Sequence, residues 1–176
     1  MSEIVKGNPY VVEGLDKLSE PEASRVSEDF FGNVFYWRKL KEPALILDAA
    51  KILHGAGARL AMVTAYNQHK VHKHLHDVCY EFVLDGVVYS CTAHMDEEHQ
   101  HVPSISRLYP NADWHEREMM ELYGILVDDH PNPRRLFLDE NLDKGLLGKV
   151  VPLSIVMNGA NSTDLWERIL SSREGK

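Results

Sequence analysis

The residues best suited to metal chemistry are four histidines in one short segment, His69, His72, His74 and His76. If this segment is extended, His72, His74 and His76 point to the same side, and three imidazoles can bind zinc or nickel. Successive residues on one side of a strand are ~6–7 Å apart, whereas the ligands of a tetrahedral zinc site are only ~4 Å apart. We therefore expect a polar connection here and keep metal handling as an alternative function.

Redox and nucleotide chemistry lack their usual residues in this sequence. The two cysteines, Cys79 and Cys91, cannot supply the four thiolates of an iron–sulfur cluster, and neither belongs to a Cys-x-x-Cys pair. The glycine-rich stretch 55–60 matches part of a dinucleotide fingerprint, but it lacks the third glycine and follows a predicted helix instead of a strand. There is no Gly-x-Ser-x-Gly elbow and no phosphate-binding loop. We expect no cofactor and no catalytic residue.

A third group of polar residues belongs to a predicted helix over 113–123. Glu116 shares a stripe with apolar residues, so we expect its carboxylate to be buried. A buried carboxylate needs a partner. Arg134 and Arg135 return after a Pro-rich turn with enough donors to satisfy Glu116 or Glu118. The stripe consists of Ala112, Glu116, Met119, Met120 and Tyr123.

Other residues of the same helix form a surface ladder and its caps. Asp113, Arg117 and Glu121 are spaced as i, i+4 pairs. Asp113 and Glu116 also have the spacing of a capping box, and Gly124 suits the C-cap. Two interpretations of the whole network stay open: it pins the loop after the helix, or part of it faces a partner protein. In the second interpretation the docking residues are Glu116, Arg117, Glu118, His130, Arg134 and Arg135.

The elements before this helix can be predicted from their patterns. Pro43 suits a first helical turn, and apolar residues then recur at helical spacing until Gly55. Residues 59–66 are apolar on both faces, which predicts an interior strand.

A hairpin follows, because strands over 78–84 and 87–95 flank the dipeptide Asp85-Gly86, which favours a type I′ turn. That register pairs Tyr80 with Cys91 and turns Cys79 to the other side, so a disulfide between the cysteines is disfavoured.

These elements predict one α+β domain over residues 1–176, with two layers, a mainly antiparallel or mixed sheet, and helices packed on one face. With 44% hydrophobic and 26% charged residues, the length suits a single core. The segment 1–40 is the least informative, and we expect some helix within residues 10–40, which include an aromatic-rich run. The C-terminal part is expected to hold a strand, a short helix and a frayed tail, over 150–157, 163–171 and 172–176.

The charge balance argues against nucleic acid as a partner. Nineteen Lys and Arg against 27 Asp and Glu give a formal net charge of −8, which repels a phosphate backbone. The first ten residues lack the apolar core of a signal peptide, and no segment approaches the ~18 apolar residues of a membrane span. We expect a soluble, cytoplasmic protein that meets a membrane only indirectly, through other proteins.

One region resembles a known family closely. Residues 102–125 read VPSISRLYPNADWHEREMMELYGI, and residues 130–136 read HPNPRRL. The Val-Pro-Ser-Ile lead, Tyr-Pro, Glu-Arg-Glu, Leu-Tyr-Gly-Ile and a His-Pro followed by Arg-Arg occur in the order of a family signature. That family is the thirty-kilodalton subunit of respiratory complex I (NADH:quinone oxidoreductase), with its relatives in membrane-bound nickel–iron hydrogenases. Downstream, residues 144–153 differ from the segment that leads into the family's tail.

The resemblance implies a non-catalytic subunit without a redox centre. It implies docking beside the large subunit that houses the quinone site or, in hydrogenases, the nickel–iron site, with iron–sulfur subunits as neighbours. It also implies a cytoplasmic position, peripheral to the inner membrane. The short length and the different tail favour a hydrogenase-type or other reduced complex. A hydrogenase-maturation protein that handles metal through the histidine segment is the alternative.

Overall fold

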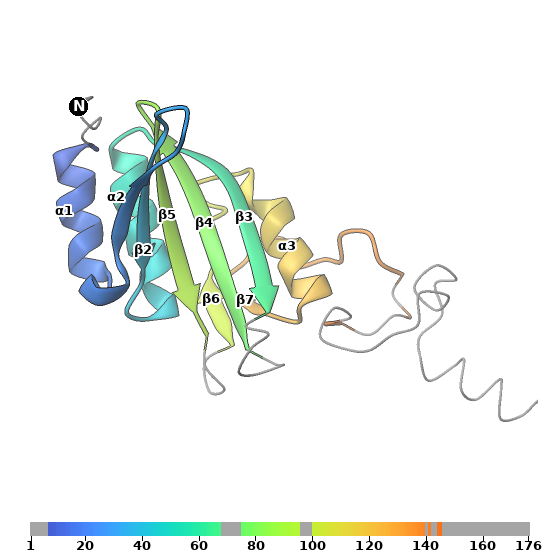
Figure 1. Ribbon diagram of the computed structural model, residues 1–176. Coiled ribbons are helices and arrows are strands. Elements are labelled where there is room, and N and C mark those ends of the chain that lie inside the picture. Colours follow the sequence, from blue (N-terminus) through green and yellow to red (C-terminus); the bar gives the residue numbers. More distant parts are fainter. Residues whose placement is uncertain (1–6, 68–74, 96–99, 140, 142–143, 146–176) are drawn as a thin grey trace, which may run out of the picture.

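The computed structural model describes residues 7–67, 75–95, 100–139, 141, 144 and 145. Within them, five strands form one mixed sheet, three α-helices lie on one of its faces, and two further strands form a small second sheet (Figure 1). The predicted α+β class is confirmed. The helices and strands are α1 (Pro9–Leu18), β1 (Arg25–Glu28), β2 (Val34–Lys39), α2 (Ile46–Gly55), β3 (Arg59–Asn67), β4 (His76–Leu84), β5 (Val87–His94), β6 (His101–Pro103), α3 (Ala112–Leu122) and β7 (Leu126–Asp128).

The large sheet has the strand order β1-β2-β5-β4-β3. Its β2 and β5 run parallel, and its other neighbouring strands run antiparallel. The small sheet pairs β6 with β7 in parallel, and α3 makes the connection between them. Parallel neighbours need a crossover, which a helix commonly supplies. The signature region therefore folds as a compact strand–helix–strand unit.

The β4–β5 hairpin has the predicted register. Asp85 and Gly86 have φ values of 51° and 80°, as a type I′ turn requires at both central positions. Tyr80 lies opposite Cys91, and Cys79 lies opposite Thr92. Both cysteines are buried and free.

The core fills the space between the helices and the covered face of the sheet. Asn8 caps α1 by accepting the N–H groups of Tyr10 and Val11, and Pro9 suits the first turn. From this face the fully buried aromatic rings are Tyr80, Phe82 and Tyr89. Burying one large apolar side chain contributes ~1.5–3 kcal/mol. The helices contribute Val11 and Leu15 from α1 and Ile46, Ala49, Ala50 and Leu53 from α2.

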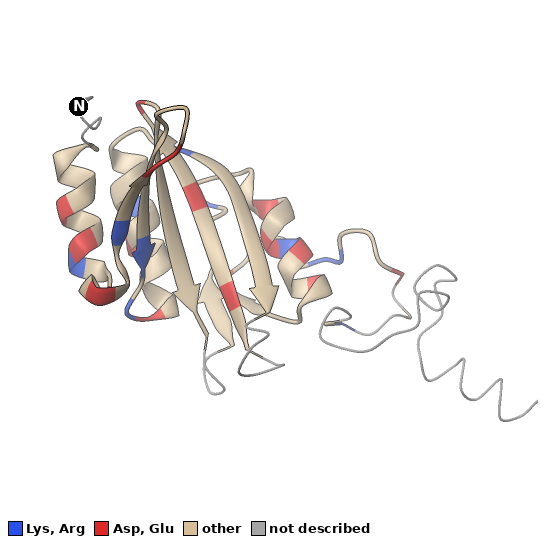
Figure 2. Cartoon of the chain, viewed as in Figure 1, with Lys and Arg blue, Asp and Glu red and all other residues tan. Residues whose placement is uncertain are grey.

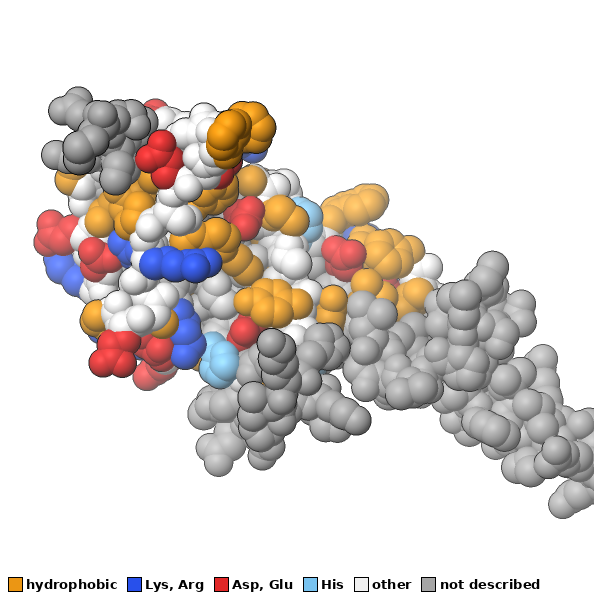
Figure 3. All heavy atoms as spheres, viewed as in Figure 1, with side chains coloured by type: hydrophobic (Ala, Val, Ile, Leu, Met, Phe, Trp, Pro, Cys, Tyr) orange, Lys and Arg blue, Asp and Glu red, His pale blue; other side chains and the backbone are white. Residues whose placement is uncertain are grey.

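The prediction of an interior strand over 59–66 was wrong, because β3 is an edge strand. Leu60 and Val63 are buried, but Met62 and Tyr66 are 44% and 43% exposed. The reason is that the helices cover only one face of the sheet. Figure 3 shows the other face, where hydrophobic side chains lie among polar and charged ones.

The N-terminal segment also differs in part from the expectation. The predicted helix exists as α1, but the aromatic-rich run forms β2, which pairs with β1. Trp37 of β2 donates its indole N–H to the hydroxyl of Ser27 in β1 over 2.8 Å. The elements expected over 150–157 and 163–171 lie outside the described residues.

Helix α3 is confirmed, and so is its C-terminal glycine, since Gly124 has φ +74°. The predicted capping box is wrong: α3 begins at Ala112, and no side chain caps it. Asp113 is therefore inside the first turn. Figure 2 shows charged side chains on α1, along the strands and on α3, which carries both signs.

Over the residues that the structure describes, no helix combines the length and apolar character needed to cross a bilayer.

Candidate functional site

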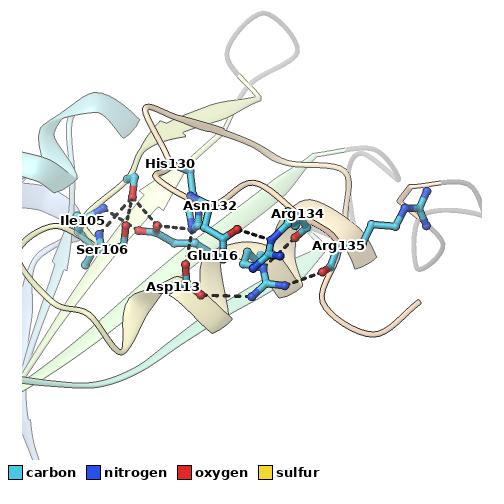
Figure 4. Close-up of polar contacts among 10 residues, drawn as sticks. Ile105, Ser106, Asp113, Glu116, His130, Asn132, Arg134 and Arg135 are labelled. Carbon is cyan, nitrogen blue, oxygen red and sulfur yellow. Dashed lines mark hydrogen bonds and ion pairs between the residues drawn. The ribbon is translucent and has the colours of Figure 1, made fainter. Parts of the chain in front are cut away.

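The centre of the candidate site is the carboxylate of Glu116, which is fully buried as the helical stripe predicted. Its Oε1 accepts the backbone N–H of Ile105 at 2.7 Å, and its Oε2 accepts the hydroxyl of Ser104 at 2.6 Å (Figure 4). The hydroxyls of Ser104 and Ser106 are 2.7 Å apart. Since Ser104 gives its proton to Glu116, Ser106 is the donor between the two serines. The carboxylate thus ties α3 to the stretch that follows β6.

His130, the first residue of the Pro-rich turn, approaches the same carboxylate. Its Nδ1 accepts the backbone N–H of Asn132 at 3.0 Å, so the neutral ring carries its proton on Nε2. That Nε2 lies 3.4 Å from Oε2 of Glu116 and 3.8 Å from Oδ1 of Asp113. The side chain of His130 is completely buried. Glu116 and His130 therefore face each other inside the domain, but Nε2 of His130 has no hydrogen-bond partner among the described residues.

The electrostatics of the pair follow from burial. Burial raises the pKa of Glu116 to about 7, although the hydrogen bonds from Ser104 and Ile105 oppose this and the nearby charge of Asp113 adds to it. Burial lowers the pKa of His130 from its usual range. A second proton on His130 would also turn Nδ1 into a donor facing the N–H of Asn132. Glu116 is therefore the group of this pair that titrates near neutral pH.

Metal binding does not suit this pair. A histidine that binds a metal through Nε2 normally donates from Nδ1, whereas Nδ1 of His130 accepts a hydrogen bond. Among the described residues, no group of three or more His, Cys, Asp or Glu side chains could hold a metal ion. His72 and His74, candidate ligands in the alternative metal-handling function, lie outside those residues. His76 begins β4, where it is buried with its Nδ1 3.1 Å from Oε1 of Gln100.

Two further residues of α3 hold the segment that follows the Pro-rich turn. Arg117 donates its Nε to the carbonyl oxygen of Arg134 at 2.8 Å and a terminal nitrogen to that of Arg135 at 2.6 Å. Its other terminal nitrogen is 3.4 Å from Oδ2 of Asp113. Glu121 is almost fully buried and accepts three consecutive backbone N–H groups, those of Leu136, Phe137 and Leu138. The segment is thus attached to α3 at five backbone atoms.

The predicted pairing of Arg134 and Arg135 with Glu116 or Glu118 is wrong. These arginines give their carbonyl oxygens to Arg117 of α3, while the side chain of Arg135 extends away from the helix and that of Arg134 turns back to Asn132 (Figure 4). Arg134 donates its Nε to Oδ1 of Asn132 at 2.7 Å, and Arg135 donates to the carbonyl oxygen of Asp139 at 2.9 Å. The cause is the direction of the chain after the turn, which places backbone and not side chains against the helix.

Some of the remaining predicted contacts are present and others are not. Of the expected ladder, Arg117 keeps its contact with Asp113, but Glu121 turns to backbone donors. Glu118 lies outside the network, on the side of α3 that faces the exposed part of β3 beside Met62 and Thr64.

Sequence reasoning missed the serines at 104 and 106, Asn132 and the role of Glu121. Serine and asparagine side chains commonly form hydrogen bonds with nearby backbone, so their presence beside a turn does not indicate a distant carboxylate as the partner. The available signal was the number of apolar residues around Glu116, which implied donors but did not name them.

Together, the fold and the site define a class of protein: a two-layer α+β domain whose signature residues bond to one another and to the backbone of the segment after α3. The family described as "Respiratory-chain NADH dehydrogenase, 30 Kd subunit" matches residues 41–157, well over half of the chain. The chain belongs to this family.

The similar proteins agree with that assignment. An NADH-quinone oxidoreductase subunit of Phenylobacterium zucineum is 41% identical over 58 residues, which is 33% of this chain and 28% of that protein. The chain thus aligns with little more than a quarter of that relative's length. A trypsin-resistant fragment (1–134) of Nqo5 has a TM-score of 0.52 at 20% identity, covering 69% of this chain and 96% of the fragment. A chain of the membrane-bound sulfane sulfur reductase, an archaeal respiratory membrane complex, has a TM-score of 0.54 at 17% identity, covering 74% and 75%. These two likenesses confirm the fold.

Proposed function

We propose that this chain is a non-catalytic structural subunit of a complex I-like oxidoreductase or a membrane-bound hydrogenase. In this proposal it docks beside the large quinone-site or nickel–iron subunit, with iron–sulfur subunits as further neighbours. Its contact with the membrane is indirect, on the cytoplasmic side. The observation that carries the proposal is the hydrogen-bond network of α3, in which the residues that match the family hold the 130–139 segment in place.

The network supports bracing because it fixes a surface segment at many points. Glu116 and Arg117 both direct their hydrogen bonds inside the domain, to Ile105 and to Arg134. Side chains held in this way are not free to act on a substrate. The result is a rigid stretch from which the side chains of Arg134 and Arg135 extend. We propose that these two, with Glu118 and the buried supports Glu116, Arg117 and His130, form the docking region.

Co-purification tests this proposal. The tagged full chain is expressed in its native host, and the proteins retained from gently solubilised membranes are identified by mass spectrometry. The proposal expects the large subunit and iron–sulfur subunits in stoichiometric amounts. Replacing Arg134 and Arg135 together by Ala should weaken this association by ~2–5 kcal/mol, since truncating a desolvated interfacial charge pair typically costs that much.

The matched control replaces two exposed lysines on the other helices, Lys17 and Lys51, by Ala. It removes the same charge, and both lysines pair only with neighbours on their own helix. The control should retain the partners. Intact association of the arginine double variant, with a lowered melting temperature, would assign both arginines to the fold and reject them as docking residues.

A further inference from the structure

Four basic side chains meet at one hollow in the surface. We call it the basic hollow; its volume is about 640 Å³, and it is lined by Arg117, Arg134, Arg135 and Lys144. The whole chain has a formal net charge of −8, so this concentration of positive charge runs against the composition. A cluster of one sign in a concave surface focuses the local potential and attracts ions of the other sign.

The cations of the hollow are only partly used by the chain itself. Arg117 is 11% exposed and is fixed by two carbonyl oxygens and by Asp113. Arg134 uses its Nε for Asn132, and among the described residues no acceptor bonds to its two terminal nitrogens. Lys144 is exposed, and no described residue forms a hydrogen bond or an ion pair with its ammonium. At least these two side chains keep donors available for an anion.

The hollow is also held in its shape before any ligand arrives. Arg117 binds the backbone of residues 134 and 135, and Glu121 binds the next three N–H groups. A site whose backbone is already fixed loses less entropy on binding than a loose one does. Arginine and lysine donors arranged on a fixed backbone suit oxyanions, and a guanidinium can bind both oxygens of one carboxylate.

We propose that the basic hollow binds carboxylate side chains of an acidic segment on a neighbouring subunit. This inference rests on the proposed function, and it names the chemistry of the partner's surface. The net charge of −8 repels any polyanion outside the hollow, so a short acidic segment suits the hollow better than a nucleic acid, whose phosphates continue beyond it. The cations come from three parts of the chain, α3, residues 134–135 and Lys144.

The experiment measures the binding of a fluorescent hexaglutamate peptide to the full chain by anisotropy. Arg134→Gln combined with Lys144→Gln should weaken binding about tenfold, because it removes the two cations with unused donors. The control, Lys17→Gln with Lys51→Gln, loses the same charge elsewhere and should bind as the wild type does. Both test residues are exposed. Their substitution should not disturb the fold, and an unchanged melting temperature of the variant checks this.

Further measurements distinguish a carboxylate peptide from the other oxyanions that the hollow could bind, namely inorganic phosphate and lipid phosphate. Raising the ionic strength from about 0.1 M to about 1 M shortens the Debye length from ~10 Å to ~3 Å and should abolish peptide binding. Inorganic phosphate should compete only weakly, and vesicles containing phosphatidylglycerol should not bind. Equal binding by the test variant and the wild type overturns the proposal. So does binding of the vesicles, or of phosphate, in place of the peptide, and so does a lack of peptide binding.

The same variants separate this inference from the proposed function. If the wild type retains its partner subunits and the Arg134→Gln, Lys144→Gln variant retains them equally, the hollow is not the contact and the function stands. If the peptide binds in the hollow but no partner subunit is retained, the proposed function fails and the anion site stands.

Discussion

Replacing Glu116 by Ala is the most direct perturbation of the site. The change removes the acceptor of two buried donors, the hydroxyl of Ser104 and the N–H of Ile105. It also leaves Nε2 of His130 without the carboxylate that it faces at 3.4 Å. We expect a less stable fold in which the contact between α3 and the Pro-rich turn is loosened.

The magnitude follows from the donors that lose their acceptor. An unsatisfied buried donor costs ~1–3 kcal/mol, so the two together cost ~2–6 kcal/mol. The middle of this range, ~3–5 kcal/mol, is the expected loss. For a chain of this size, 1 kcal/mol shifts the melting temperature by ~2–4 °C, so a fall of roughly 6–20 °C is expected.

Thermal unfolding followed by circular dichroism measures this fall. The measurement belongs on the acidic side of neutrality, because Glu116 is then protonated and the variant gains nothing by removing a buried charge. Glu118→Ala is the matched control: it lies two positions along the same helix, outside the network, and should change the free energy of unfolding by less than ~1 kcal/mol. If Glu116→Ala melts like the wild type, Glu116 is not the buried acceptor and the reasoning about the site is refuted.

Three other outcomes are expected. The pKa of Glu116 is raised from 4.5 to about 7 in the folded chain. Its protonation therefore contributes about 3 kcal/mol to the free energy of unfolding, fully present below pH 4.5 and lost as the pH rises through 7. In denaturant titrations at several pH values, the free energy of unfolding of Glu116→Gln should lack this dependence on pH. Burial raises the pKa of both thiols, that of Cys91 to about 12, so neither should react with a thiol reagent until the chain unfolds, and fast labelling of the native chain would contradict this. The purified chain should carry no iron, flavin or nicotinamide, and a stoichiometric visible chromophore would overturn that expectation.

Local patterns predicted the parts of the fold that local forces determine. The hairpin at Asp85-Gly86 depends on a turn that only a few dipeptides adopt, so its register could be read directly. The burial of Glu116 followed from helical periodicity alone. The place of β3 at the sheet edge could not be predicted in this way, because it depends on the order in which distant strands pair.

The partners of the site residues were the harder part. A buried carboxylate implies hydrogen-bond donors near it. Ser104, however, lies 12 residues from Glu116 in the sequence, and their contact depends on how β6 and α3 pack together. Arginines near a buried glutamate in sequence suggested an ion pair, yet only the backbone of Arg134 faces α3. Sequence spacing gives the distance along a chain, and after a Pro-rich turn it does not give the direction of a side chain.

The parallel pairing of β2 with β5 has a consequence for the order in which the chain can fold during synthesis. Val34 pairs with Val87, 53 residues later (87 − 34). At ~5–20 residues per second, a ribosome makes β5 roughly 3–10 s after β2. Throughout that interval the edge of β2 that later pairs with β5 is unpaired, and such an edge can pair with strands of other chains. We therefore expect the yield of folded protein in a cell to depend on how well that edge of β2 is protected while the chain is made.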